Sequence, residues 1–183
     1  MTDVGLLSTV EQAGLIRRGE ISSRELTEHF IERIENLDGE INSVITRDFE
    51  TALDEADAAD AGQQKGESMG VLHGVPITVK DALQTKNLRS TGGATELRDN
   101  VPPKDAAVVA SVRREGGIVM GKTNLPRWSG DIQAYNDIFG TTNNPWDVSR
   151  GPGGSSGGAA AAVAMGFTSF EIGTDIGGSI RFP

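Results

Sequence analysis

Amphipathic helices dominate the first third of the chain. The motifs Ser8-Thr-Val-Glu11 and Ser22-Ser-Arg-Glu25 are capping boxes, which begin helices because each serine and glutamate satisfies free backbone N–H groups. The first helix is expected from about Thr9 to Arg18, where Gly19 ends it. The second helix carries apolar side chains at helical spacing on one face: Leu26, Phe30, Ile34 and Leu37.

Short apolar runs rich in β-branched residues alternate with helical segments along the rest of the chain. The runs predict strands: Ile41 to Thr46, Val75 to Val79, Gly117 to Met120 and Thr168 to Ile172. Helices are expected between them: Asp48 to Ala61 with an acidic face, Asp105 to Glu115 with Asp105 as its cap, and Ala159 to Met165. Residues 62–70 and 81–104 lack periodicity and are expected to be loops, the second lying over the surface. This order predicts an α/β fold with a mixed, largely parallel sheet covered by helices on both faces.

Composition and charge exclude several classes of protein. The 183 residues carry a net charge of −9 without a basic stripe, so no nucleic-acid partner is expected. The absence of cysteine excludes disulfides and thiolate metal sites, and two histidines make no metal cluster. No signal peptide is recognisable, and the longest apolar run, Ala159 to Met165, is too short to cross a bilayer. We therefore expect a cytoplasmic protein that has no membrane contact.

One motif matches a nucleotide-binding loop by letter only. Gly116 to Thr123 fits the pattern G-x-x-x-x-G-K-[ST]. A phosphate-binding loop needs a strand before it and a helix beginning at its lysine, so that free N–H groups face the phosphates. Here a helix precedes, the residues between the glycines form the strand, and Pro126 follows Lys122 closely. We therefore do not expect nucleotide binding at this segment.

Two serines embedded in glycine and one strand-end lysine are the candidates for chemistry. Ser155 lies in Gly153-Gly-Ser-Ser-Gly-Gly158 and Ser179 in Gly173-Thr-Asp-Ile-Gly-Gly-Ser179, while Lys80 ends an apolar strand. Serine needs a base to become a nucleophile, and lysine can serve if burial lowers its pKa to about 7–8. Glycine turns can direct several N–H groups at an oxyanion. Taken singly, each run is more simply a turn and the lysine a solvated charge, but their combination favours a serine–lysine hydrolase.

The histidines are weaker candidates for the base. His29 falls on the second amphipathic helix and His73 in the loop before a strand. Neither has a serine in the G-x-S-x-G arrangement as its partner. Both are expected to be structural.

These motifs together resemble the amidase signature of the Ser-cisSer-Lys amidases. The resemblance extends through His73-Gly-Val-Pro-Ile-Thr-Val-Lys-Asp81, Val119 to Asn124 and Gly140 to Asp147. It implies that Ser179 is the acyl-forming nucleophile, that Ser155 bridges it to the base Lys80 after a cis peptide at Gly154, and that Ser156 is a hydrogen-bonding neighbour. The implied oxyanion hole consists of four backbone N–H groups: Ile176, Gly177, Gly178 and Ser179. No cofactor or metal is implied, and Asp175 and Arg181 are interpreted as a structural pair.

The sequence departs from the family pattern in two respects. Arg127 occupies a position where relatives usually carry an acidic residue, so a local ion pair is expected to be lost or reversed. Family members are also more than twice as long. We therefore expect residues 1–183 to be the N-terminal portion of a single domain, with a mostly helical lead-in over 1–62 and a catalytic α/β segment over 63–183, lacking further strands and part of the acyl pocket.

The resemblance implies an amidase that hydrolyses a linear carboxylic amide to an acid plus ammonia or an amine through an acyl-enzyme. Two alternatives remain: the glutaminase subunit of a tRNA-dependent amidotransferase, and a catalytically incomplete fragment. Phe182 and the segment from Trp128 to Phe139 are more typical of free-standing amidases. The expected partners are a small-molecule amide and either a second copy of the chain or a missing C-terminal half.

Overall fold

A mixed four-stranded sheet forms the centre of the molecule. The computed structural model describes residues 3–67 and 70–183. The strands follow the order β1-β3-β2-β6, and their bounds are β1 Val44–Arg47, β2 Pro76–Lys80, β3 Ile118–Thr123 and β6 Glu171–Ile172. β1 is antiparallel to β3, whereas β3, β2 and β6 are parallel to one another. The predicted mixed, largely parallel sheet is confirmed.

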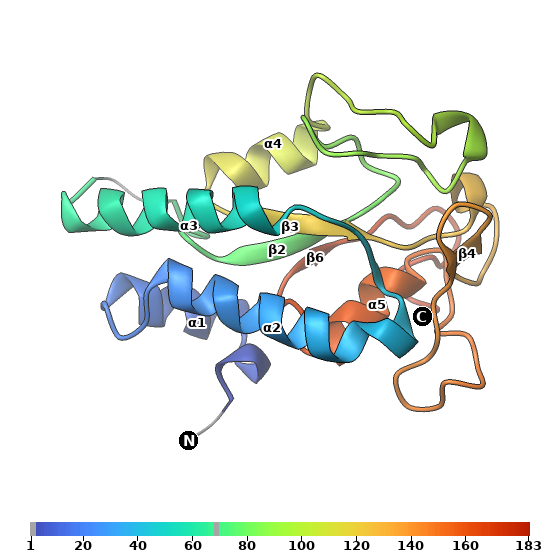
Figure 1. Cartoon of the computed structure of the whole chain (residues 1–183), viewed down its shortest axis with the longest axis horizontal. Helices are drawn as coiled ribbons and strands as arrows, with labels where there is room; N and C mark the ends of the chain where they lie inside the picture. The colour runs from blue at the N-terminus through green and yellow to red at the C-terminus, as the bar shows by residue number, and fades with distance from the viewer. Residues whose placement is uncertain (1–2, 68–69) are drawn as a thin grey trace.

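Helices cover both faces of this sheet, as predicted (Figure 1). One face carries α3 (Phe49–Gln64) and α4 (Ala107–Arg114), and the other carries α1 (Thr9–Arg17), α2 (Ser23–Ile41) and α5 (Gly157–Ala164). Shorter elements complete the described chain: 3-10 turns at Val4–Leu6, Thr95–Leu97 and Arg127–Ser129, and a small hairpin of β4 (Tyr135–Asn136) with β5 (Gly140–Thr141). No helix within residues 3–67 and 70–183 is long and apolar enough to cross a membrane.

The N-terminal helices largely follow their sequence pattern. Both capping boxes form, and Gly19 adopts a φ of +68° just after α1. Leu26, Phe30 and Ile34 of α2 are fully buried, but Leu37 is 45% exposed, so its predicted place in the core is wrong. Next to it, Asp38 turns inward and accepts hydrogen bonds from the backbone N–H groups of Ser43 and Val44. This buried carboxylate takes the inward position because it holds the turn from α2 into β1.

Several predicted boundaries shift by a few residues. Ile41 is the last residue of α2, so β1 begins later, at Val44. α3 continues into the predicted loop as far as Gln64, and residues 68–69 of that loop lie outside the described residues. β6 contains only the last two residues of its predicted run. Strand length is limited here because β6 pairs with β2 alone, through Thr78 and Val79.

The segment 81–104 is predicted to lie over the surface, and this prediction is wrong for its inner half. Thr85, Ser90 and Thr91 are buried. Lys122, fully buried within β3, donates hydrogen bonds to Thr85 Oγ1 and Ser90 Oγ at 3.0 Å each. Polar side chains fold inward here because they satisfy a buried ammonium group. The strand position of Lys122 also confirms that this segment is no phosphate-binding loop.

The predicted cap at Asp105 is also wrong. α4 begins after Ala106, which makes no side-chain capping bond. The Asp105 carboxylate instead accepts the backbone N–H of Lys86 at 2.6 Å. The side chain therefore fastens the preceding loop rather than the helix.

Candidate active site

The carboxyl ends of the parallel strands bring the candidate residues together. Lys80 is the last residue of β2, and β6 leads directly into Gly173 and Thr174. Lys80 is fully buried, and its Nζ lies 2.6 Å from Ser155 Oγ and 2.8 Å from Thr174 Oγ1. Segments that leave the carboxyl ends of neighbouring parallel strands meet at the same edge, which is where α/β proteins bind ligands. The first predicted pair, Lys80 with Ser155, is therefore in direct contact.

The buried position changes the acidity of the lysine. Burial lowers the pKa of Lys80 to about 8, because the charged ammonium loses its hydration. The carboxylates of Asp175 and Glu171 act in the opposite direction and favour the charged form. The net shift brings a neutral amine within reach near neutral pH, which is the condition for a lysine base.

Glycine positions Ser155 at the entrance to α5. The peptide bond between Gly154 and Ser155 is cis, as the resemblance predicts. A Cβ atom on Gly154 would lie only 2.2 Å from the carbonyl oxygen of Gln133, so no larger residue fits this backbone. Ser155 itself is fully buried, with its hydroxyl directed at Lys80.

Ser179 lies on the other side of the same cavity. A space of about 550 Å³ is bounded by Ser155, Ser179, Thr174 and the segment 128–132. The carbonyl oxygen of Ser179 accepts the backbone N–H of Ser156 at 3.0 Å, which ties the two glycine-rich runs together. Within the described part of the chain, no hydrogen bond joins the hydroxyls of Ser155 and Ser179. The structure thus gathers all three predicted side chains around one cavity, with a direct contact between two of them.

Asp175 organises the turn that carries the predicted oxyanion donors. Its carboxylate accepts the N–H groups of Gly178 at 2.7 Å and Ile180 at 2.9 Å, and it pairs with Arg181 at 2.9 Å. The guanidinium of Arg181 holds the pKa of Asp175 well below its usual range. The predicted pair is therefore present. Of the four predicted donors, Gly178 already donates to Asp175, whereas Ile176, Gly177 and Ser179 line the cavity.

Sequence reasoning missed Thr174. Its hydroxyl accepts from Lys80, and its backbone N–H and carbonyl both bond to Ser156 Oγ, at 3.3 and 3.1 Å. Ser156 is thus the hydrogen-bonding neighbour that the resemblance predicts. The signal for Thr174 was its place inside the second glycine run, directly after the strand.

Replacing Thr174 with valine is expected to lower turnover about tenfold. The variant keeps the size of the side chain but removes the acceptor for the charged form of Lys80, so the pKa of Lys80 should also fall. The pH profile of kcat/KM would show both effects. An unchanged rate and profile would contradict a role for this hydroxyl, and Thr174→Ser is the matched control that keeps it.

The remaining candidates lie away from the cavity or at its rim. His29 contacts Asp3 at 2.9 Å, and His73 Nε2 lies 3.1 Å from the carbonyl oxygen of Ala59, so neither histidine is placed to act as a base for Ser179. Arg127 at the rim pairs with Glu96 at 2.8 Å and lowers the pKa of that carboxyl to about 2. The ion pair at this position is therefore present with the basic partner on the 127 side.

Comparison with known proteins agrees with this arrangement. The family model described as Amidase matches residues 25–183. One subunit of the glutamyl-tRNA(Gln) amidotransferase of Moorella thermoacetica is 46% identical over 177 residues, which are 97% of this chain and 36% of the relative. The chain therefore spans little more than a third of the length of that curated relative.

Solved structures share the same backbone. Fatty acid amide hydrolase superposes with a TM-score of 0.92 at 28% identity, covering 98% of this chain and 32% of that one. The structure of 6-aminohexanoate cyclic dimer hydrolase gives a TM-score of 0.87 at 32% identity, covering 98% and 36%.

Proposed function

The chain belongs to the amidase signature family, and we propose that it carries the catalytic residues of an enzyme that hydrolyses a linear carboxylic amide to an acid plus ammonia or an amine. The observation that carries this proposal is the 2.6 Å contact between the buried Lys80 and Ser155, at a cavity that Ser179 also lines. A lysine whose pKa is lowered by burial, linked to a serine at the edge of a cavity, is the arrangement that serine activation without histidine requires.

In the proposed reaction, Ser179 Oγ attacks the amide carbon while its proton passes to Ser155 and the proton of Ser155 passes to neutral Lys80. The oxyanion that forms is stabilised by backbone N–H groups of the turn 176–179. The tetrahedral intermediate collapses when the leaving nitrogen takes the proton back through the same relay, which breaks the C–N bond and leaves an acyl-Ser179 ester. Water then attacks this ester, and the relay accepts and returns its proton in the same way.

This mechanism predicts an acid limit on the rate. Lys80 acts in its neutral form and its pKa lies at about 8, so activity is lost as the pH falls through that value. We expect kcat/KM to rise about tenfold per pH unit below the pKa and to level off above it. A pH–rate profile with a linear amide measures this limit. A rate independent of pH between 6 and 9 (a range of about three units around the pKa) would contradict the lysine as base.

The nucleophile can be identified by covalent labelling. A fluorophosphonate probe should modify Ser179, as located by peptide mass spectrometry, and Ser179→Ala should abolish the adduct. Ser149→Ala is the matched control, because the Ser149 hydroxyl bonds only to Asp147 in an exposed loop. An adduct at another serine would overturn the assignment.

A second candidate is the glutaminase subunit of a tRNA-dependent amidotransferase. The 46% identity to one subunit of a glutamyl-tRNA(Gln) amidotransferase supports it, against the expectation from Phe182 and the segment from Trp128 to Phe139. The same serine chemistry would then release ammonia from glutamine for a partner. Ammonia production from glutamine, compared with that from simple linear amides, and co-purification with partner subunits distinguish the two candidates.

A further inference from the structure

A carboxyl group that the proposed reaction does not use lies on the same face of the sheet as Lys80. Glu171 of β6 is the register partner of Thr78 in β2. Side chains of paired residues point to the same face, and so do residues two apart along a strand. Thr78, Lys80 and Glu171 therefore share one face, the one that α5 covers.

Two hydroxyls hold this carboxyl group. Thr78 Oγ1 donates to one carboxyl oxygen of Glu171, and Thr123 Oγ1 donates to the other at 2.8 Å. Thr123 is the register partner of Lys80 in β3. The donors thus come from β2, which carries the lysine, and from its neighbour β3, and they fix the orientation of the carboxyl group within the sheet.

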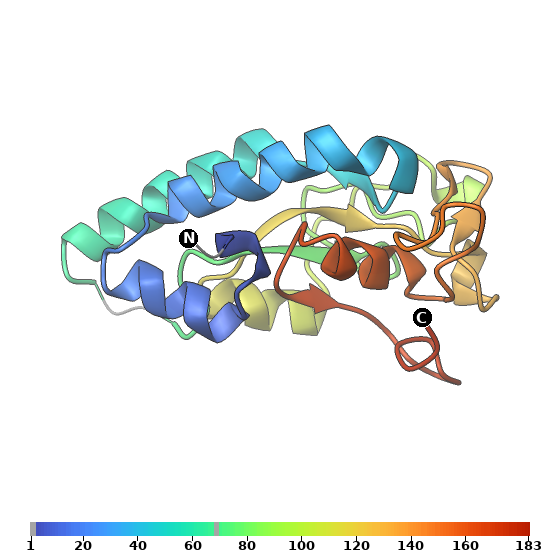
Figure 2. The ribbon, with the colours of Figure 1, turned by 90° about the horizontal axis from the view of Figure 1, so that it is seen from below.

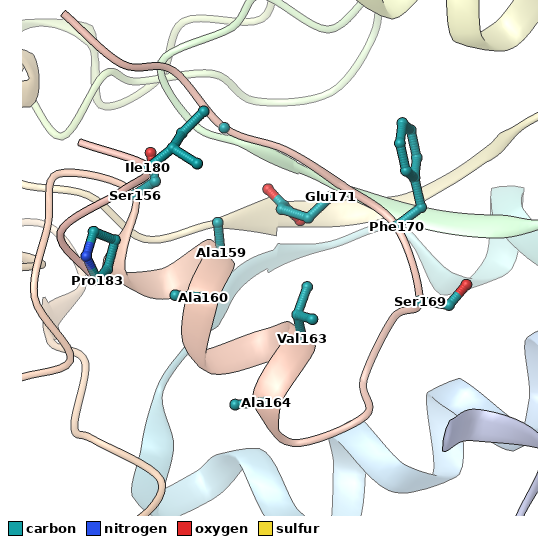
Figure 3. A pocket seen from close by; sticks show the side chains of 11 residues that line it. Ser156, Ala159, Ala160, Val163, Ala164, Ser169, Phe170, Glu171, Ile180 and Pro183 are labelled. Carbon is teal, nitrogen blue, oxygen red and sulfur yellow. The ribbon is translucent and has the colours of Figure 1, made fainter. Parts of the chain in front are cut away.

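The surroundings of Glu171 are otherwise apolar. Figure 3 shows its carboxyl group directed toward α5, near Ser156 and Ala159, at the inner side of a cavity of about 440 Å³. Val163, Phe170 and Ile180 contribute apolar walls to this cavity. Burial raises the pKa of Glu171 to about 7, with the two hydroxyls acting in the opposite direction.

The charges that face this group come from two strands. Lys80 of β2 and Lys122 of β3 both favour the ionised form of Glu171. α5, which packs over it, has the sequence GGAAAAVA and carries no titratable side chain. On the Lys80 side, Asp175 is the other carboxylate that favours the charged amine, and its pairing with Arg181 keeps it ionised.

We propose that Glu171 is a positioning residue that, held by Thr78 and Thr123 beside Lys80, opposes loss of the lysine proton and so sets the pH at which the Lys80–Ser155 relay works. The inference rests on the proposed function for its catalytic meaning. Its physical content is an electrostatic coupling between two side chains. The ionised carboxylate raises the pKa of Lys80, and removing the charge lets burial lower that pKa further.

Nuclear magnetic resonance of the lysine side chains tests the coupling without any substrate. The chain has five lysines, so the Cε resonance of Lys80 can be assigned by its loss in Lys80→Met. In Glu171→Gln the titration midpoint of Lys80 should fall by about 0.5 to 1 pH unit. Glu171→Asp, which keeps the charge, should restore most of the difference. Glu55→Gln is the matched control, because Glu55 pairs with Arg113 at 2.8 Å on the far face of the sheet.

A second variant protects the test against misfolding of Glu171→Gln. Thr123→Val removes one donor to the carboxylate but leaves the glutamate in place, so the Lys80 midpoint should fall in the same direction by a smaller amount. A Lys80 midpoint that stays at the wild-type value in the folded variants would overturn the proposal.

The kinetic readout separates this inference from the proposed function. In the coupled enzyme, the acid limb of kcat/KM moves to lower pH in Glu171→Gln by the same amount as the Lys80 midpoint. A merely structural role would lower the rate at every pH without moving the limb, and would overturn the proposal. If the Lys80 midpoint shifts but Ser179 is never labelled by a fluorophosphonate, the coupling stands and the proposed function fails. If labelling succeeds without a shift, the coupling alone fails.

Discussion

Replacing Lys80 with alanine is expected to lower the rate of amide hydrolysis by about 10³-fold or more. The variant removes the only amine in contact with Ser155 among the described residues, so neither serine can pass its proton to a base. The rate of acyl-enzyme formation, followed by fluorophosphonate labelling of Ser179 over time, measures the loss directly. Wild-type rates in the variant would refute the lysine as base.

Two further variants show whether the proton relay or the charge of the lysine matters. Lys80→Arg keeps a positive charge but does not release its proton near neutral pH, so it should be as inactive as alanine. Ser155→Ala should lose as much as Lys80→Ala, and the double variant should lose no more than either, because residues that act as one unit are not additive. Additive losses would mean that Ser155 and Lys80 contribute independently. Circular dichroism of each variant controls for folding.

The fold could be predicted from local patterns where those patterns have one physical solution. Capping boxes and helical spacing predict α1 and the first three turns of α2, and β-branched runs predict the strands at the centre of the sheet. The prediction failed where a buried polar group decides the packing. Asp38 takes the inward position beside Leu37, and the loop 81–104 folds over Lys122 to satisfy its ammonium. These choices depend on contacts between distant segments, which periodicity does not contain.

The candidate site was predicted in identity rather than in geometry. Lys80, Ser155 and Ser179 stood out because glycine-rich runs and a strand-end lysine are conspicuous in the sequence, and the structure brings them to one cavity. The supporting groups were not visible in this way. Thr174 and Glu171 acquire their roles only because β6 lies beside β2 in the sheet (Figure 2), which places a carboxyl group and a hydroxyl next to the lysine. Strand order is a property of the whole fold, so single motifs do not reveal these partners.

Gly158 offers the second large effect, this time on stability. Its N–H donates to the carbonyl oxygen of Asn124 at 3.1 Å, which places the start of α5 directly against the end of β3. A Cβ atom at Gly158 would lie 2.3 Å from the Asn124 nitrogen and 2.6 Å from its oxygen. Both neighbours are backbone atoms that cannot rotate away. Gly158→Ala is therefore expected to lower the free energy of unfolding by about 3 kcal/mol and to displace Ser155, which precedes the helix.

Gly39→Ala is the matched control for this variant. Gly39 lies in α2, is exposed, and has no atom within 4 Å of a Cβ built on it. Alanine there restricts the unfolded chain and favours the helix, so the free energy of unfolding should rise by about 0.5–1 kcal/mol. Urea denaturation followed by circular dichroism measures both changes on one scale. If Gly158→Ala proved as stable as the wild type, α5 would have to move away from Asn124, and the contact that positions Ser155 against Lys80 would not depend on a glycine.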